Sequence, residues 1–106
     1  MVASLSDHLI ISKKIKNVMH VYQVHAEYYN KDCKLVKRTL LSTYLNKNTA
    51  IKDLNGILKS KESLYIKDCI QSEYHDLDNT LDNFQVFCGG KIHESFGISN
   101  VSINCD

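Results

Sequence analysis

The 106-residue chain contains no proline and no tryptophan, and it has only four glycines. Without proline there is no X-Pro peptide bond whose slow isomerisation delays folding. The chain also lacks a long apolar run, because no window approaches the about 20 apolar residues that a membrane-spanning helix requires. Its first residues show neither the basic start nor the apolar stretch of a secretory signal peptide. We therefore expect a cytoplasmic protein.

Motifs that carry chemistry are also missing. The sequence contains no C-x2-C pair, no G-x-S-x-G elbow, no G-x-G-x-x-G loop and no Walker loop. In the cytoplasm the four cysteines are expected to be free thiols: Cys33, Cys69, Cys88 and Cys105. The hydrophobic content of 43% and the charged content of 24% are ordinary for a globular chain. We expect one domain over residues 1–106 that is not an enzyme and carries no cofactor.

The strongest structural pattern lies in residues 18–45, where two runs rich in β-branched and aromatic residues flank a short polar cluster. This pattern predicts a β-hairpin. In the first strand, one alternate face is expected to be buried: Val18, His20, Tyr22, Val24, Ala26 and Tyr28. Cys33 fits poorly at a positive φ, so a loop of four or five residues is expected. The return strand, residues 35–44, alternates less regularly and is expected near an edge.

Residues 46–60 change to a helical period, with an N-cap expected at Thr49 or Asn48. Their apolar stripe comprises Ala50, Ile51, Leu54, Ile57 and Leu58. Residues 63–74 fit a strand or a helix, and their β-rich composition favours a strand. Gly89-Gly90 predicts a second hairpin, and residues 101–105 a final strand. The predicted class is α+β, a small mostly antiparallel sheet in β-β-α-β-β-β order with one amphipathic helix on one face. Residues 1–17 fit one helical turn or an irregular lead-in.

Charge is distributed unevenly along the chain. Residues 1–67 hold twelve basic and five acidic residues, a net charge of +7, whereas residues 68–106 hold one basic and seven acidic residues, a net charge of −6. Such asymmetry indicates charged partners, unless the two halves interleave in space and neutralise each other.

Four carboxylates within ten residues form the first candidate site: Glu73, Asp76, Asp78 and Asp82. An EF-hand is excluded, because counting from Asp76 places Leu81 at the sixth position and Phe87 at the twelfth. One interpretation is a solvated acidic loop. The other is an acidic patch that docks on the basic groove of another protein.

The first hairpin offers a second candidate site, which combines cations with aromatic rings: Tyr28, Tyr29, Lys31, Lys34, Lys37 and Arg38. Cations bind phosphates and rings stack on bases, so this set suits nucleic acid. The sequence pI of about 7.7 is low for such a domain, however. Lysines at a hairpin also protect exposed strands from indiscriminate pairing.

A third arrangement, Cys69-x5-His75-x12-Cys88-x4-His93, supplies the ligand types of a tetrahedral zinc site. Its first spacing is wide, and both cysteines lie in apolar runs where free cysteine usually packs as a small buried side chain. We therefore expect no metal, with a zinc site as the alternative.

Together these features predict a small non-enzymatic protein that binds another protein. We expect an inhibitor or an immunity or anti-defence factor, such as the anti-CRISPR proteins of phages and mobile elements, that masks a charged surface of its partner. The partner is expected to be a nucleic-acid-binding enzyme or a toxin. The alternatives are direct nucleic-acid binding through the hairpin and a small zinc protein. Homodimer formation through an unpaired sheet edge is compatible with all three.

Overall fold

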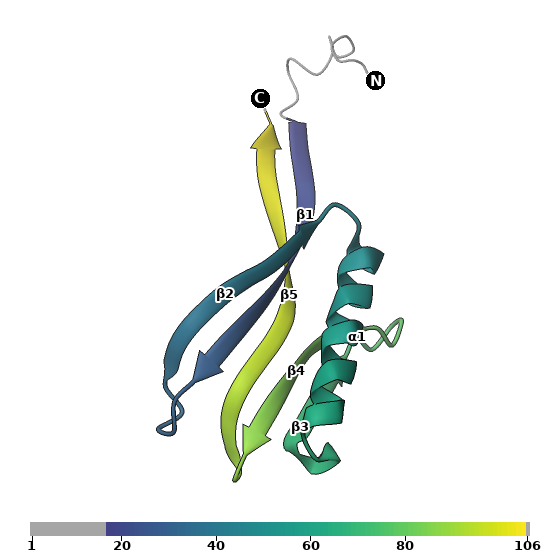
Figure 1. Ribbon diagram of the computed structural model, residues 1–106. Coiled ribbons are helices and arrows are strands. Elements are labelled where there is room, and N and C mark those ends of the chain that lie inside the picture. The colour runs from purple at the N-terminus through teal and green to yellow at the C-terminus, as the bar shows by residue number, and fades with distance from the viewer. Residues whose placement is uncertain (1–16, 106) are drawn as a thin grey trace.

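The computed structural model describes residues 17–105 and shows one helix packed against a five-stranded sheet (Figure 1). The sheet order is β2-β1-β5-β4-β3, and every neighbouring pair is antiparallel. The elements are β1 (Asn17–Tyr29), β2 (Leu35–Tyr44), α1 (Lys47–Leu64), a 3₁₀ turn (Lys67–Cys69), β3 (Ile70–Tyr74), β4 (Leu81–Cys88) and β5 (Lys91–Cys105). The α+β class and the predicted element order are confirmed. No helix in the described part of the chain has the length and apolar character needed to cross a membrane.

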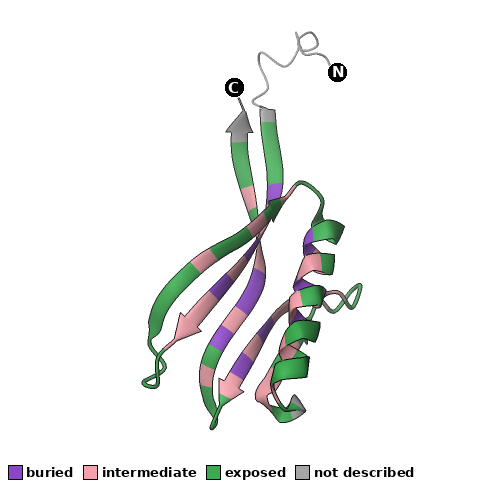
Figure 2. Ribbon diagram, viewed as in Figure 1, coloured by how far each residue is buried: buried purple, intermediate pink, exposed green. Residues whose placement is uncertain are grey.

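The core lies between α1 and one face of the sheet, where the buried segments of β1, β4 and β5 face the helix (Figure 2). The rings of Phe84 and Phe96 stack at its centre with their centroids 4.9 Å apart. The buried cluster consists of Val24, Ala26, Ala50, Leu54, Leu58, Leu81, Phe84, Val86 and Phe96. Burying aromatic and aliphatic side chains of this size stabilises the fold by about 1.5–3 kcal/mol each.

The predicted buried face of β1 is correct from Tyr22 onward and wrong before it. Val24 and Ala26 are fully buried, but Val18 and His20 are exposed. The reason is that β1 and β5 extend beyond the other strands, since β1 meets β2 only from Tyr22 (Figure 1). The lead-in predicted for residues 1–17 lies outside the described residues, except that Asn17 begins β1.

The helix begins earlier than predicted. Asn46 is the N-cap, because its Oδ1 atom accepts hydrogen bonds from the backbone nitrogens of Asn48 at 2.7 Å and Thr49 at 3.4 Å. The prediction of Asn48 or Thr49 as the cap is therefore wrong. Both residues instead donate the free N–H groups that a helix start must satisfy.

The helix also ends later than predicted, at Leu64. Ser60 and Ser63 lie in its last turns, where their hydroxyls donate to the carbonyl oxygens of Gly56 at 3.2 Å and Ser60 at 2.7 Å. Serine hydroxyls that bond back to the preceding turn are compatible with a continuing helix. The strand expected from Ser63 consequently begins only at Ile70.

Both predicted hairpins are present. The first has a five-residue loop, residues 30–34, in which Asn30 Oδ1 accepts from the backbone nitrogens of Asp32 and Lys34 at 2.9 and 3.1 Å. Cys33 adopts a φ of 62° in this loop, although a positive φ was expected to be unfavourable for this cysteine. The second hairpin turns through Gly89 and Gly90 at φ 59° and 77°, as predicted.

Candidate functional site

The four acidic residues of the first candidate site do not gather on one surface. Glu73 pairs in register with Asn83, so the two side chains share one face of the sheet. That face is the one away from α1, where Asn83 Cβ lies beside Gly97. Asp82 instead lines a pocket with Lys47 and Ile51 of α1. A bulge between β3 and β4 separates them, since the register shifts between Glu73 and Tyr74. The predicted acidic docking surface therefore stays a prediction, without one common face to support it.

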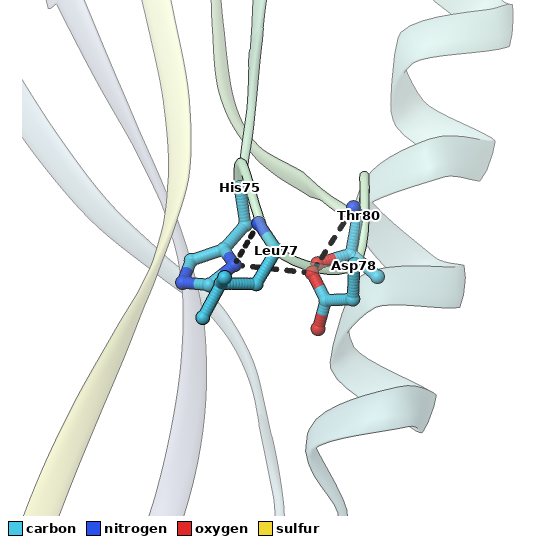
Figure 3. Close-up of polar contacts among 4 residues, drawn as sticks. All are labelled: His75, Leu77, Asp78 and Thr80. Carbon is cyan, nitrogen blue, oxygen red and sulfur yellow. Dashed lines mark hydrogen bonds and ion pairs between the residues drawn. The ribbon is translucent and has the colours of Figure 1, made fainter.

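Asp78 is satisfied within its own loop (Figure 3). Its Oδ1 atom accepts from Thr80 Oγ1 at 2.9 Å and from the Thr80 backbone nitrogen at 3.4 Å, and it lies 3.2 Å from His75 Nδ1. Leu77 N–H also donates to that ring nitrogen at 3.3 Å. The hydrogen bond from the Thr80 hydroxyl lowers the pKa of Asp78, and His75 and Lys47 add smaller electrostatic effects in the same direction. The loop therefore holds the Asp78 carboxylate through neutral donors, and 55% of the side-chain surface stays exposed.

The tyrosines of the second candidate site point to opposite faces of the sheet. The ring of Tyr28 meets Phe96 edge-to-face, with centroids 6.4 Å apart, on the helix side. The hydroxyl of Tyr29 donates to Glu27 Oε1 at 3.1 Å on the other side, and Glu27 Oε2 lies 3.8 Å from Arg38 Nε. Burial raises the pKa of Tyr29, and the bond to Glu27 adds to this effect. The two rings therefore provide no common platform for stacked bases.

The cations of the hairpin remain exposed, and the fold adds one that sequence reasoning missed. Lys31, Lys34 and Lys37 are exposed, and Lys91 Nζ donates to the Lys31 carbonyl oxygen at 3.3 Å, across 60 residues of sequence. A signal was present, because Lys91 is the single basic residue of the acidic half and directly follows the Gly-Gly turn.

The four ligands of the zinc alternative do not converge in the part of the chain that the structure describes. Cys88 and His93 line one pocket, but no three His, Cys, Asp or Glu side chains within residues 17–105 are placed to hold a metal ion. The three cysteines with described side chains are free, and two of them, Cys33 and Cys88, are exposed. The interpretation of Cys88 as a small buried side chain is therefore wrong. The side chain of Cys105 lies outside the described ones.

The largest concentration of exposed apolar side chains lies on β2, the long edge strand of the sheet. We call this surface the β2 edge. Its apolar members and their exposed fractions are Leu35 (51%), Val36 (61%), Leu40 (55%), Leu41 (41%) and, directly after the strand, Leu45 (70%). Sequence reasoning found the edge but not this surface, because an apolar residue in a strand is usually interpreted as core.

Two bulges divide the β2 edge. The register with β1 shifts between Val24 and His25 and between Tyr28 and Tyr29, which leaves Leu41 and Val36 as extra residues on β2. Residues 37–40 lie between them and include the exposed Lys37 and Arg38. Only the far end of β2 is tied to α1, where the Ser42 and Tyr44 hydroxyls donate to Asp53 Oδ2 at 2.6 and 2.9 Å.

His25 lies on the face of the sheet opposite the helix. Its Nε2 atom is 2.9 Å from Ser99 Oγ, whereas its buried Nδ1 atom has no hydrogen-bond partner among the described residues. Gly97 allows the close approach, since a Cβ atom there would lie 3.4 Å from the imidazole Cε1. Burial lowers the pKa of His25, and the Arg38 charge adds to this effect. The pair lacks the third group that orients the base in a nucleophilic triad.

We find no protein-family model, no curated protein and no solved structure that matches the chain. Function must therefore be inferred from the surfaces described above.

Proposed function

We propose that this protein is a non-enzymatic binding factor that captures an extended segment of a partner protein along the β2 edge. One observation carries the proposal: four large apolar side chains are exposed on a ten-residue edge strand, and a fifth, Leu45, directly follows it. Monomeric proteins usually protect long edges or keep them short, because unpaired N–H and C=O groups form a template for another strand. Apolar patches that remain exposed commonly mark interaction sites.

The other edge of the sheet shows the usual protection. β3 has only five residues, and its outward positions include the polar Gln71 and Glu73. Both edges belong to one sheet and meet the same solvent, so the difference between them is a property of β2 itself.

Charge on β2 specifies the chemistry of the partner. Lys37 and Arg38 lie between the apolar ends of the strand, and Arg38 keeps 60% of its side-chain surface exposed despite its contact with Glu27. A matching segment carries one or two acidic residues flanked by apolar ones. The bulges restrict ladder pairing to a few residues, so side-chain complementarity contributes most of the selectivity.

This proposal keeps the protein-binding role expected from the sequence and moves it to a different surface. An inhibitor or immunity-type factor works in this way when the captured segment belongs to the working surface of its partner. We propose that this protein is such an inhibitor or immunity-type factor.

The test compares the wild type with Arg38→Glu/Leu40→Asp, a variant altered only at exposed positions. Each protein is immobilised, partners are recovered from host lysate, and the recovered partner is purified. Hydrogen exchange then measures whether the amides of residues 37–40 become protected in the complex. A matched control is Leu64→Asp/Leu77→Asp, which alters two leucines that are 74% and 91% exposed elsewhere.

We expect the control to retain the partner, the β2 variant to lose it, and the β2 amides to slow in the wild-type complex. Equal capture by all three proteins, or unchanged exchange at β2, would show that the β2 edge does not bind the partner. A wild-type dimer in sedimentation that the β2 variant abolishes would identify a second copy as the occupant and overturn the proposed acidic segment.

A further inference from the structure

A pocket opens where the two hairpin turns meet, and none of the residues that line it lies on β2. It has a volume of about 390 Å³, within the range of about 300–1,000 Å³ that is typical of small-molecule sites. Its lining comes from the turn between β1 and β2 and from the adjoining ends of β4 and β5. Both turns lie at the same end of the sheet (Figure 1). We call it the turn pocket, and it is lined by Tyr29, Asn30, Lys31, Cys88, Lys91, Ile92 and His93.

The lining of the turn pocket carries two lysines and an imidazole but no carboxylate. Lys91 Nζ is held by a neutral acceptor, the carbonyl oxygen of Lys31, so its positive charge is positioned without being neutralised. The nearest acid on β5, Glu94, is buried and already lies 2.8 Å from Lys61 Nζ. A second pocket differs, because it is lined by both Lys47 and Asp82.

We propose that the turn pocket binds a phosphate group, with Lys31 and Lys91 as the cations that contact it. Lysine ammonium groups are common phosphate ligands and act as point charges with several donors. The volume leaves room for the group to which the phosphate is attached. Lys34 and Lys37 continue the positive charge along the first hairpin, where a chain of phosphates would follow. The phosphate can therefore come from a nucleic-acid backbone or from a free nucleotide.

The test measures binding of a fluorescent single-stranded oligonucleotide to the wild type across a range of salt concentrations. It is repeated with Lys31→Ala/Lys91→Ala and with Lys47→Ala/Lys52→Ala, which removes the same charge from α1. Each phosphate contact to a single strand contributes a slope of about 0.7 in log K against log salt. We expect the turn-pocket variant to lose roughly 1.4 of this slope, and the α1 variant to lose little. Circular dichroism confirms that both variants are folded.

A second arm separates the two sources of phosphate. Adenosine monophosphate and inorganic phosphate are titrated into labelled protein while amide NMR signals are recorded. Shifts confined to residues 29–34 and 88–93 of the wild type, without oligonucleotide binding, would support a free nucleotide or phosphate. Equal loss of slope in both variants would reduce the effect to net charge and overturn the proposal. Absence of oligonucleotide binding together with unmoved amides would also overturn it.

Discussion

Two lysines near the beginning of β5 differ in what faces the ammonium group. Lys61 Nζ lies 2.8 Å from a carboxylate oxygen of Glu94 and 5.2 Å from the centre of the Phe96 ring, beneath the helix. Lys91 Nζ bonds to the neutral carbonyl of Lys31 beside another lysine. Glu94 and Lys91 are three positions apart on one strand. Glu94 nevertheless forms an ion pair beneath the helix, whereas Lys91 lies at the turn without an acidic partner.

The difference follows from burial. Glu94 is only 8% exposed, and a carboxylate removed from water requires a partner cation. Lys91 is exposed, where water stabilises its charge and no acid is needed. A positive charge that is not paired with an acidic side chain of the same protein is available to a ligand. The interior pair therefore contributes to stability, and the turn lysines are the pair for which we propose a role in binding. Each half of this contrast can be tested.

The largest expected effect concerns the interior pair. Lys61→Met leaves Glu94 buried without its cation and is expected to lower the free energy of unfolding by about 3–5 kcal/mol. Urea denaturation measures the change, with Lys59→Met at an exposed position of the same helix as the control. The double variant Lys61→Met/Glu94→Leu should recover most of the loss, because an apolar pair replaces a buried ion pair at little cost. A loss below about 1 kcal/mol for Lys61→Met would show that Glu94 finds water or another donor, and the contrast would fail.

His25 extends the contrast to a half-buried group that has no opposite charge at hydrogen-bond distance. Its lowered pKa means that the unfolded chain takes up a proton near pH 6.5 while the folded protein does not. The contribution to stability is therefore complete above about pH 6.5 and is lost as the pH falls toward the folded pKa. Thermal unfolding between pH 8 and pH 5 should show a flatter profile for His25→Gln than for wild type. Parallel profiles for the two proteins would contradict this prediction.

Local patterns predicted much of the fold, and long-range partners were not predictable. The alternation around Val24 and Ala26 and the Gly89-Gly90 turn each act within a few residues, so they can be recognised in one sequence. The contact of Lys61 with Glu94 joins a helix to a strand 33 positions away, and nothing local marks either residue as buried. The contact of Lys91 with Lys31 likewise depends on the arrangement of two separate hairpins.

The acidic segment is the opposite case. Glu73 and Asp82 are close in sequence, but strand alternation and one bulge direct them to different faces. Proximity along the chain predicts a common surface only where the backbone is helical or irregular, not where it crosses a bulged sheet. The same limit applies to Tyr28 and Tyr29, since adjacent residues of a strand face opposite sides.

Asp78 extends the contrast to an exposed carboxylate, where the hydrogen bond from Thr80 lowers the pKa and has little effect on stability. Carbon-13 NMR titration should place its midpoint below the ordinary value of 3.8, because Thr80 donates to the ionised carboxylate. The stabilising contribution is present above that ordinary value and is lost as the pH falls through the folded pKa. Thr80→Ala should raise the midpoint more than His75→Gln does, since the hydroxyl bond is the largest cause of the shift. The reverse order would mean that the imidazole dominates.

The smallest effect on stability is expected at the second lysine of the contrast. Lys91→Met should change the free energy of unfolding by less than about 0.5 kcal/mol, because an exposed ammonium on a neutral carbonyl contributes little. The same substitution should weaken phosphate binding if the turn lysines serve a ligand. Urea denaturation beside Lys61→Met measures the first quantity under identical conditions. A loss above about 1 kcal/mol would show that Lys91 stabilises the contact between the two hairpin turns. Its charge would then serve stability, and the contrast with Lys61 would fail.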